Sequence, residues 1–343
     1  MTEVETRISG SYGETAMDDA GRLAHTHREL PVPSTANMPR LSIITASRNR
    51  AALLSQAMDS VFAEAKDGIE LIVVDGQSND GTAELLARYP SITVVRHPPR
   101  GVYDAFNKGL EAATGDIVCF LNGDDLLAPG GVGVVRETFG SHPEVDVVCC
   151  GATAFEYRDG DWKTFRAYRN TVEIDLNVRS VTTGVPLLNA KFFRRSLIER
   201  IGQFDVTYRF AADRDFLIRI IAEAPTMRVV PAVVYQYRKH AGSLTLDQGL
   251  CRWLEIKREH VALSAAWSAR ADAPRAVQKA ASRWYHEETA KLLVRNESIG
   301  ARLQVARQAL ERSRLWPVRA VAAGASIVMA RLSRRLRPGV GRP

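Results

Sequence analysis

The chain has 343 residues, and its 45% hydrophobic and 25% charged content is that of a globular protein large enough to bury a core without disulfide or metal support. No run of 18 or more apolar residues occurs, which excludes a clear transmembrane helix. The net charge of +7 is local: residues 301–343 hold ten arginines and one acid, 10 − 1 = +9, which leaves 7 − 9 = −2 for residues 1–300. The basicity therefore belongs to the C-terminus, and we expect no nucleic-acid partner.

The first 38 residues are polar and lack the apolar segment of a signal peptide or membrane anchor, so we expect a disordered tail. The four cysteines show no metal-ligand spacing, and the adjacent pair Cys149 and Cys150 lies in the apolar run VDVVCCGA, where cysteines behave as small buried hydrophobes. Unpaired buried cysteines are typical of a reducing compartment. We therefore expect a cytoplasmic protein.

Two kinds of sequence pattern alternate between Leu41 and Asn122. Four short runs rich in β-branched residues predict strands, at residues 41–47, 69–75, 91–97 and 116–122. The segments between them have helical spacing, at about 50–64, 81–89 and 102–113. This alternation predicts an α/β fold with a mostly parallel sheet and helices on both faces. Ligands bind such a sheet at the carboxyl ends of its strands, where polar residues gather here, at 45–50, 75 and 122–125.

After Gly130 the alternation of predicted strands and helices becomes less regular. Residues 144–157 predict one long strand or two, residues 161–169 another, and residues 228–240 a late strand. From about Leu250 the chain is predicted to be helical and increasingly basic. We expect a tail over residues 1–38, a ligand-binding domain over 39–248 and an arginine-rich helical extension over 249–343.

Two phosphate-binding motifs are missing from the sequence. The first predicted strand is followed by ASRNRA, which has no glycine, and GGVGVV at 130–135 lacks the third glycine of a dinucleotide-binding fingerprint. No GxxxxGK[ST] loop occurs either. Dehydrogenases, and ATPases or kinases of the phosphate-loop class, are therefore disfavoured.

Two motifs place polar side chains beside strand ends. In VVDGQSNDGT, residues 73–82, Asp75 ends a strand, where a carboxylate can accept a hydrogen bond from the imide N–H of a nucleobase, while Asp80 is best explained as a helix cap. Residues 101–116 then predict a helix with three polar side chains on one face, Asp104, Asn107 and Lys108. A solvated helix face is the default interpretation of this pattern. The helix leads straight into the next strand and its polar end, which shifts the weight toward a functional role.

That strand ends in CFLNGDD, residues 119–125, where Asn122, Asp124 and Asp125 follow a buried run. Three oxygen-bearing side chains within four residues are typical of a hard-cation site, in which Mg²⁺ or Mn²⁺ takes one or two carboxylates and fills its other positions with water and phosphate oxygens. Asp125 has an alternative role as the cap of the next helix, near LAPGGV.

A later motif, RFAADRDFLIRII at residues 209–221, places Asp213 and Asp215 at the start of an apolar-periodic helix. An ion pair within the helix is expected between Asp215 and Arg219, four residues on. Asp213 does not share a helix face with Asp215, because the two are only two residues apart. The helix N-terminus keeps the Asp213 carboxylate ionised, as a general base requires. His240, just after the last predicted strand, is by itself more typical of a surface or core residue than of a functional one.

Six stretches, taken in order, resemble the family-2 glycosyltransferases with the GT-A fold: SIITASRNR, VVDGQSNDGT, GVYDAFNKGLEAATGDIVCFLNGDD, FFRRSLIERIGQFD, AADRDFLIR and YRKHAGS. The resemblance covers roughly Leu41 to Thr245. It is tightest to bacterial enzymes that carry a G-[IV]-Y-D-A-x-N-K-G block and build exopolysaccharides, surface glycans and glycolipids. It implies a Rossmann-like mixed central sheet flanked by helices, followed here by the C-terminal helical extension.

The resemblance also implies roles for the residues that match. Asn122-Gly123-Asp124 stands in place of the family's DxD element, with Asp124 as the principal ligand of Mg²⁺ or Mn²⁺ and His240 reaching the metal or the diphosphate. Asp213 matches the catalytic base, although Ala212 replaces the glutamate that usually precedes it. The residues expected to bind a nucleotide-sugar donor are Thr45, Asn49, Arg50, Asp75, Asp104, Asn107, Lys108, Asn122, Gly123 and Asp124.

These roles imply an inverting, metal-assisted transfer of a sugar from a UDP-, GDP- or dTDP-sugar to an acceptor hydroxyl. The acceptor is expected to be a glycan or lipid-linked, but its identity does not carry over, because HPPRGVYD has prolines, and VPLLNAKFF an Asn189-Ala190 pair, where relatives often differ. QGLCRW, residues 248–253, has one residue too many for the QxxRW of processive synthases, which disfavours a processive enzyme.

The C-terminal residues 317–338 predict an amphipathic helix with an apolar stripe and outward arginines. Such a helix suits the anionic inner face of the plasma membrane, and packing on the preceding domain explains the pattern equally well. Two other classes of protein stay open. One is a nucleotide-sugar-binding protein without catalysis. The other is a nucleotidyltransferase with a similar sheet, although ASRNRA lacks the phosphate loop that such an enzyme needs.

Overall fold

A computed structural model describes residues 16–17, 23–24, 38–64, 67–243, 249–295, 299–313 and 316–321. The chain divides into two compact units, Met1–Asn37 and Met38–Pro343. In the first unit β1 (Ala16–Met17) pairs with antiparallel β2 (Leu23–Ala24). Otherwise the tail predicted over residues 1–38 lies almost wholly outside the described residues, as does most of the predicted amphipathic helix over 317–338.

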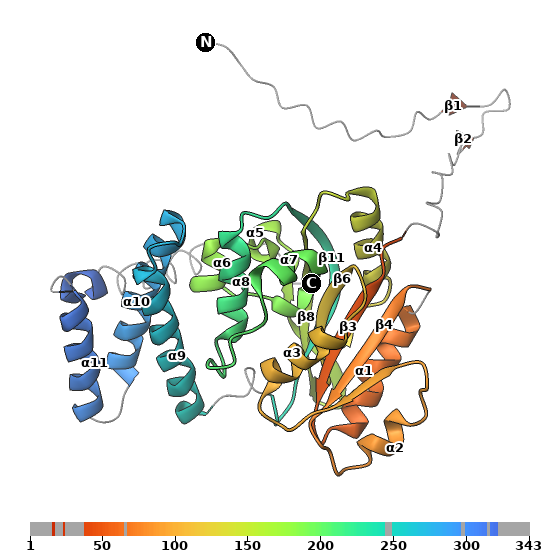
Figure 1. Cartoon of the computed structure of the whole chain (residues 1–343), viewed down its shortest axis with the longest axis horizontal. Coiled ribbons are helices and arrows are strands. Elements are labelled where there is room, and N and C mark those ends of the chain that lie inside the picture. The colour runs from red at the N-terminus through yellow and green to blue at the C-terminus, as the bar shows by residue number, and fades with distance from the viewer. Residues whose placement is uncertain are drawn as a thin grey trace. The chain divides into compact units, whose positions relative to one another are not determined.

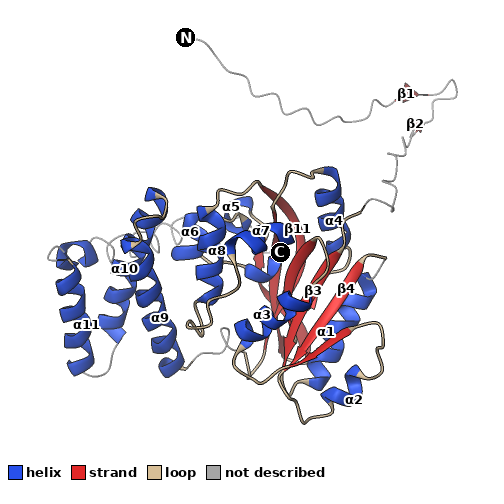
Figure 2. Cartoon of the chain, viewed as in Figure 1, coloured by secondary structure: helices blue, strands red, loops and turns tan. Residues whose placement is uncertain are grey.

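The second unit is built on a nine-stranded sheet in the order β5-β4-β3-β6-β10-β8-β11-β7, with β9 paired to β8 (Figures 1 and 2). The strands are β3 Leu41–Ser47, β4 Ile69–Asp75, β5 Thr93–Arg96, β6 Ile117–Asn122, β7 Leu126–Leu127, β8 Val147–Arg158, β9 Asp161–Tyr168, β10 Lys191–Arg194 and β11 Met227–Lys239. Strands β5, β4, β3 and β6 run parallel, whereas β10 is antiparallel to both β6 and β8. The predicted mixed α/β sheet is confirmed.

Helices cover both faces of this sheet and bury its central strands. They are α1 Ala51–Glu64, α2 Thr82–Leu86, α3 Val102–Ala112, α4 Gly131–Ser141, α5 Thr171–Ile174, α6 Val178–Thr182, α7 Arg195–Ile201, α8 Ala212–Ala222, α9 Leu250–Ala269, α10 Arg275–Arg295 and α11 Ile299–Arg312, with a 3₁₀ turn η2 at Leu188–Ala190. Successive residues of β3 point to opposite faces, so Ile43 packs with α1 and α4 while Ile44 packs with α3 and α8. Burial on both faces explains the near-continuous apolar runs of the parallel strands.

The late strand β11 is irregular at Pro231. Its register against β8 shifts between Val230 and Val233, because proline has no N–H to donate to the ladder. Residues 144–157, predicted as one strand or two, belong to the single long strand β8. The short strands β7 and β10 carry too few residues for a periodic signal, and the sequence does not predict them.

The C-terminal helices α9 and α10 share the core on the α3 and α8 side of the sheet. Trp267 and Trp284 are buried beside Phe216 and Leu217 of α8, and the Trp267 indole N–H donates to the Asp215 carboxylate (2.9 Å). A domain boundary near residue 248 stays a prediction. Among the described helices, none combines the length and the apolarity that crossing a bilayer requires.

Candidate active site

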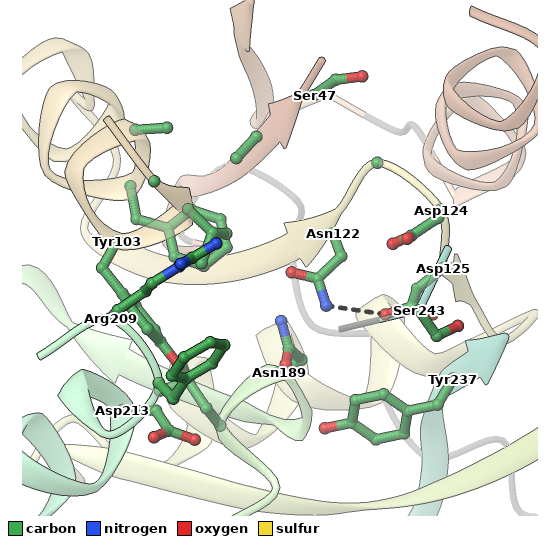
Figure 3. Close-up of a pocket in the computed structure, with 18 of the residues that line it drawn as sticks. Ser47, Tyr103, Asn122, Asp124, Asp125, Asn189, Arg209, Asp213, Tyr237 and Ser243 are labelled. Atoms are coloured by element: carbon green, nitrogen blue, oxygen red, sulfur yellow. Dashed lines mark hydrogen bonds between the residues drawn. The ribbon is translucent and has the colours of Figure 1, made fainter. Parts of the chain in front are cut away.

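A pocket of about 890 Å³ opens at the carboxyl ends of β3, β4 and β6 (Figure 3). These parallel strands end at the same edge of the sheet, which brings polar residues distant in sequence together. The loop before α3, the start of α8 and the end of β11 close the sides of the pocket, and α9 adds a further wall. The pocket therefore combines the predicted ligand-binding edge with the C-terminal extension.

Asp124 lies in this pocket between two nitrogen donors. Its Oδ2 atom contacts the Arg50 guanidinium, and His240 Nε2 lies 3.0 Å from the same oxygen. The Gly242 N–H donates to His240 Nδ1 (3.1 Å), so Nε2 carries the proton of the neutral ring and donates to Asp124. Arg50 also donates to the Gly242 carbonyl (3.1 Å). These two nitrogen donors thus fix the position of the carboxylate at the end of β6.

Gly123 allows the segment before Asp124 to approach β3. A Cβ atom at Gly123 would lie 3.0 Å from the Ala46 carbonyl oxygen and 3.1 Å from the Ser47 side chain, and the Gly123 N–H donates to that carbonyl (3.2 Å). A larger residue would push the loop away from the sheet and move Asp124 with it.

Asp125 faces the protein interior, in contrast to its neighbour. It is 4% exposed and accepts hydrogen bonds from the Tyr235 hydroxyl (2.7 Å), the Arg238 N–H (2.7 Å) and the Asn122 amide (2.9 Å). Burial raises the pKa of Asp125, and these hydrogen bonds oppose the rise. Asp125 therefore ties the end of β6 to β11. The alternative role as a helix cap is wrong, because Gly130 occupies the N-cap of α4.

The donor set around Asp124 fits a hard cation only in part. No three histidines, cysteines or carboxylates gather as metal ligands within the described ranges. Both carboxylates of the CFLNGDD segment line the pocket, but Asp125 is engaged in hydrogen bonds within the protein, which leaves Asp124 as the available ligand. Figure 3 shows the amide oxygen of Asn122 on the side away from Asp125. One carboxylate and one amide oxygen suffice for a cation that takes its other ligands from water and phosphate oxygens.

Asp213 lies in the first turn of α8, across the pocket from Asp124 (Figure 3). Desolvation raises the pKa of Asp213, while the Arg214 guanidinium and hydrogen bonds from the Arg214 N–H (2.7 Å) and from Tyr103 oppose the rise. Arg214 is itself fixed, because its guanidinium donates to the carbonyls of Val181, Thr182 and Gly184 and packs over the Trp284 ring. As expected, Asp215 instead pairs with Arg219 (2.8 Å).

Three predicted donor-binding residues lie at the same edge of the sheet without lining the pocket. Asp75 is 1% exposed and accepts from the Ser78 N–H (3.2 Å). Asn49 has a left-handed backbone (φ 51°), and its side chain accepts from the Asn79 N–H (2.9 Å), which joins the loops after β3 and β4. Thr45 is buried, and its hydroxyl has no partner among the described residues. Their roles in donor binding stay predictions.

The three polar residues on one face of α3 all contact other residues of the chain. Asn107 is buried and exchanges two hydrogen bonds of 2.9 Å with the Phe204 backbone, while Lys108 pairs with Glu111 (2.8 Å). Asp104 contacts His97 Nε2 (2.5 Å). None of these three residues lines the pocket, and their roles in donor binding stay predictions. Asp80 accepts from the N–H groups of Ala51 (2.9 Å), the first residue of α1, and Thr82 (3.3 Å). Gly81 occupies the N-cap of α2, so Asp80 is not the predicted cap of that helix.

The pocket wall formed by α9 was missed by the sequence analysis. Trp253, Ile256, Lys257 and His260 follow helical spacing and line the pocket from one face of α9. Lys257 donates to Glu288 of α10 (2.8 Å), and burial lowers the pKa of His260 to about 4, so this ring is neutral. Only QGLCRW gave a signal here, because it ends in Trp253.

The same helix fixes the loop that carries Asp213. The Glu259 carboxylate of α9 accepts from the N–H groups of Arg209 (3.0 Å), Phe210 (2.7 Å) and Ala211 (2.9 Å), directly before α8. A carboxylate at the start of a helix satisfies free N–H groups and complements the helix dipole. The C-terminal extension therefore sets the position of α8 and one side of the pocket.

Comparison with known proteins shows to which family this chain is similar. The family model described as glycosyl transferase family 2 matches residues 42–202. A PGL/p-HBAD biosynthesis glycosyltransferase of Mycobacterium bovis is 31% identical over 211 residues, 60% of this chain and 78% of that protein. The glycosyltransferase EpsJ of Bacillus subtilis is 26% identical over 222 residues, 61% of this chain and 63% of that protein.

Two solved structures share the fold at low sequence identity. The S. aureus TarS 1-349 structure superposes with a TM-score of 0.58 at 16% identity, covering 83% of this chain and 87% of that chain. The mannosyltransferase PcManGT from Pyrobaculum calidifontis, in complex with GDP-Man and Mn²⁺, gives a TM-score of 0.52 at 19% identity, covering 85% and 86%. At these identities the similarity shows a shared fold and nothing beyond it.

Proposed function

Because the chain belongs to glycosyl transferase family 2 and is a glycosyltransferase, we propose that it transfers a sugar from a nucleotide-sugar donor to an acceptor hydroxyl with inversion, in the synthesis of a bacterial surface glycan or glycolipid. One observation carries this proposal: Asp124 and Asp213 face the same pocket from opposite sides. An in-line displacement needs this separation, with a base on the side of the attacking oxygen and positive charge on the side of the leaving group.

The donor side of the pocket is the edge formed by β3, β4 and β6. Arg48 and Arg50 line it, and Arg48 has no carboxylate partner among the described residues. We assign both arginines to the diphosphate and keep Asp75, buried at the tip of β4, as the proposed contact of the base. A divalent cation held by Asp124, with the Asn122 oxygen beside it, would supply Lewis-acid stabilisation of the departing diphosphate.

The base side of the pocket is the start of α8. The raised pKa of Asp213 makes its carboxylate a stronger base than an ordinary aspartate. Tyr103 and the Arg214 N–H hold that carboxylate in place. We therefore assign to Asp213 the removal of the acceptor hydroxyl proton, while that oxygen attacks the anomeric carbon and the nucleoside diphosphate leaves.

The acceptor side is formed by α9 and the loop before α8. Trp253 lines the pocket with the Arg295 guanidinium over its ring (4.9 Å to the ring centroid), and Arg209 lines the pocket without a carboxylate partner among the described residues. An aromatic side chain together with guanidinium groups suits a glycosyl acceptor that carries an anionic group. We further propose that the amphipathic pattern of residues 317–338 binds the membrane surface in which a lipid-linked acceptor lies.

Donor binding is tested by thermal unfolding with a panel of UDP-, GDP- and dTDP-sugars in the presence of Mn²⁺. A donor present at about 100 times its Kd should raise the unfolding temperature by about 5 °C, because it binds only the folded chain. The free bases and sugar phosphates serve as controls and should have little effect. If none of the nucleotide sugars stabilises the chain, the proposed donor class is wrong.

The acceptor wall is tested by Trp253→Ala. With an acceptor that supports turnover, we expect the KM for the acceptor to rise about tenfold, because an aromatic packing face is lost, while the rate of donor hydrolysis stays unchanged. The matched control is Trp162→Ala on β9, which removes a half-exposed tryptophan that does not line the pocket. Equal effects of the two substitutions, or a rise in the KM for the donor alone, would remove α9 from the acceptor site.

A further inference from the structure

A second pocket, of about 390 Å³, lies among the C-terminal helices α9, α10 and α11 and the helical residues 316–321. We call it the C-terminal pocket. Its polar and charged lining residues are Ser268, Ser282, His286, Arg312, Ser313 and Arg319. No acidic residue lines it, although the surrounding helices carry several. It shares no lining residue with the candidate active site.

The two arginines of the C-terminal pocket keep their positive charges uncompensated. Arg312 Nη2 donates to the Ser268 hydroxyl (2.9 Å) and contacts the Ala265 carbonyl, and its guanidinium packs over the Tyr285 ring (5.2 Å). Neither Arg312 nor Arg319 pairs with a carboxylate among the described residues. The one acid of α11, Glu311, pairs instead with Arg307 (2.8 Å). The C-terminal pocket is thus lined by two guanidinium groups that have no carboxylate partner among the described residues.

His286 is the buried member of this pocket. It is 6% exposed, and neither of its ring nitrogens has a hydrogen-bond partner in the described part of the chain. Burial lowers the pKa of His286, and the charges of Arg319 and Arg312 lower it further, so the ring is neutral. A neutral imidazole still offers one N–H donor, and buried polar groups without partners are rare in folded proteins. An acceptor for this N–H is therefore missing from the part of the chain that the structure describes.

We propose that the C-terminal pocket binds a phosphate group, with Arg312 and Arg319 as charged donors and His286 as the buried donor. Guanidinium groups match phosphate oxygens in geometry and charge, and the hydroxyls of Ser282 and Ser313 add further donors. The phosphate comes either from a membrane lipid headgroup or from a free phosphate compound. The sequence after the pocket favours a headgroup, because residues 322–343 contain five arginines and no acid, as segments drawn to anionic lipid do.

The test uses the full chain and three substitutions. His286→Gln identifies the imidazole NMR signal of His286 by its loss. Arg319→Gln removes one charge from the pocket, and the Arg319 side chain makes no hydrogen bond within the described part of the chain. Arg307→Gln removes the same charge from α11 outside the pocket and serves as the matched control. Inorganic phosphate is titrated against each protein while the His286 signal is followed.

We expect phosphate to shift the His286 signal in a saturable way, with a midpoint at least tenfold higher in Arg319→Gln and unchanged in Arg307→Gln. In a second arm, sedimentation with phosphatidylglycerol vesicles, and with phosphatidylcholine vesicles for comparison, distinguishes the sources. A loss of phosphatidylglycerol binding in Arg319→Gln alone supports a lipid headgroup. A response to phosphate with equal vesicle binding by both arginine variants supports a free phosphate compound. If the His286 signal does not respond and the two variants bind vesicles equally, the proposal is overturned.

Discussion

Asp213→Asn should lower the turnover of glycosyl transfer by about 10²- to 10⁴-fold, the contribution that a positioned general base makes. The amide keeps the shape of the side chain but cannot take a proton from the acceptor hydroxyl. Donor binding should be spared, because Asp213 lies across the pocket from Asp124. Turnover is measured with saturating donor and acceptor, and donor affinity by thermal unfolding of the same variant.

The control for this variant is Asp272→Asn, which removes an exposed carboxylate between α9 and α10 that does not line the pocket. It should leave turnover unchanged. An Asp213→Asn enzyme with near-normal turnover would show that another group accepts the proton. A parallel loss of donor binding and of turnover would instead show that the substitution disturbs the pocket as a whole.

The pH dependence of the reaction follows from the same carboxylate. A general base acts only when deprotonated, so the rate falls as the pH drops through the pKa of Asp213. Desolvation raises that pKa, so the acidic decline should begin at a higher pH than for an ordinary aspartate, whose pKa is about 3.9. This acidic decline should be present in the pH profile of kcat/KM of the unmodified enzyme and absent from the residual activity of Asp213→Asn. A profile that is flat on the acidic side would contradict the assignment.

The sheet was predictable because its central strands are buried on both faces. The runs at 41–47 and 69–75 become β3 and β4 with the limits expected, since a parallel strand covered by helices must be apolar nearly throughout. The position of Asp124 followed from the same rule, because the end of β6 lies at the edge of the sheet where ligands bind. These features were predictable because each of them depends on residues that are close together in the sequence.

The roles of Asn107 and Asp125 were beyond such reasoning. Helical spacing shows which residues share a face but not what that face meets, and Asn107 meets the backbone of Phe204, 97 residues later in the chain. Asp125 is satisfied by Tyr235 and Arg238, 110 and 113 residues away. The α9 wall was out of reach for the same reason, since no local pattern indicates that Lys257 will lie beside a site built by β3 and β6.

Asp124→Ala should change nucleotide binding in opposite directions with and without metal. With Mn²⁺ present, we expect the Kd for the nucleoside diphosphate to rise at least about tenfold, because the carboxylate proposed to hold the cation is lost; even indirect supports of a metal site are worth 10- to 100-fold in affinity. With chelator present, the substitution frees the Arg50 guanidinium and His240 from the carboxylate that they contact. The diphosphate then meets one negative charge fewer, so its Kd should fall or stay unchanged.

This crossed pattern separates the role of Asp124 as a metal ligand from a role as a structural partner of Arg50. If Asp124 only positioned Arg50, its loss would weaken binding equally with Mn²⁺ and with chelator, since the arginine would be misplaced in both. Arg50→Gln tests the opposite case: it removes the cation that the diphosphate meets and should weaken binding in both conditions. Calorimetric titration of UDP and GDP into the two variants measures all four values. Equal losses in Asp124→Ala under both conditions would show that the transfer depends on the basic residues of the pocket and not on a metal held by Asp124.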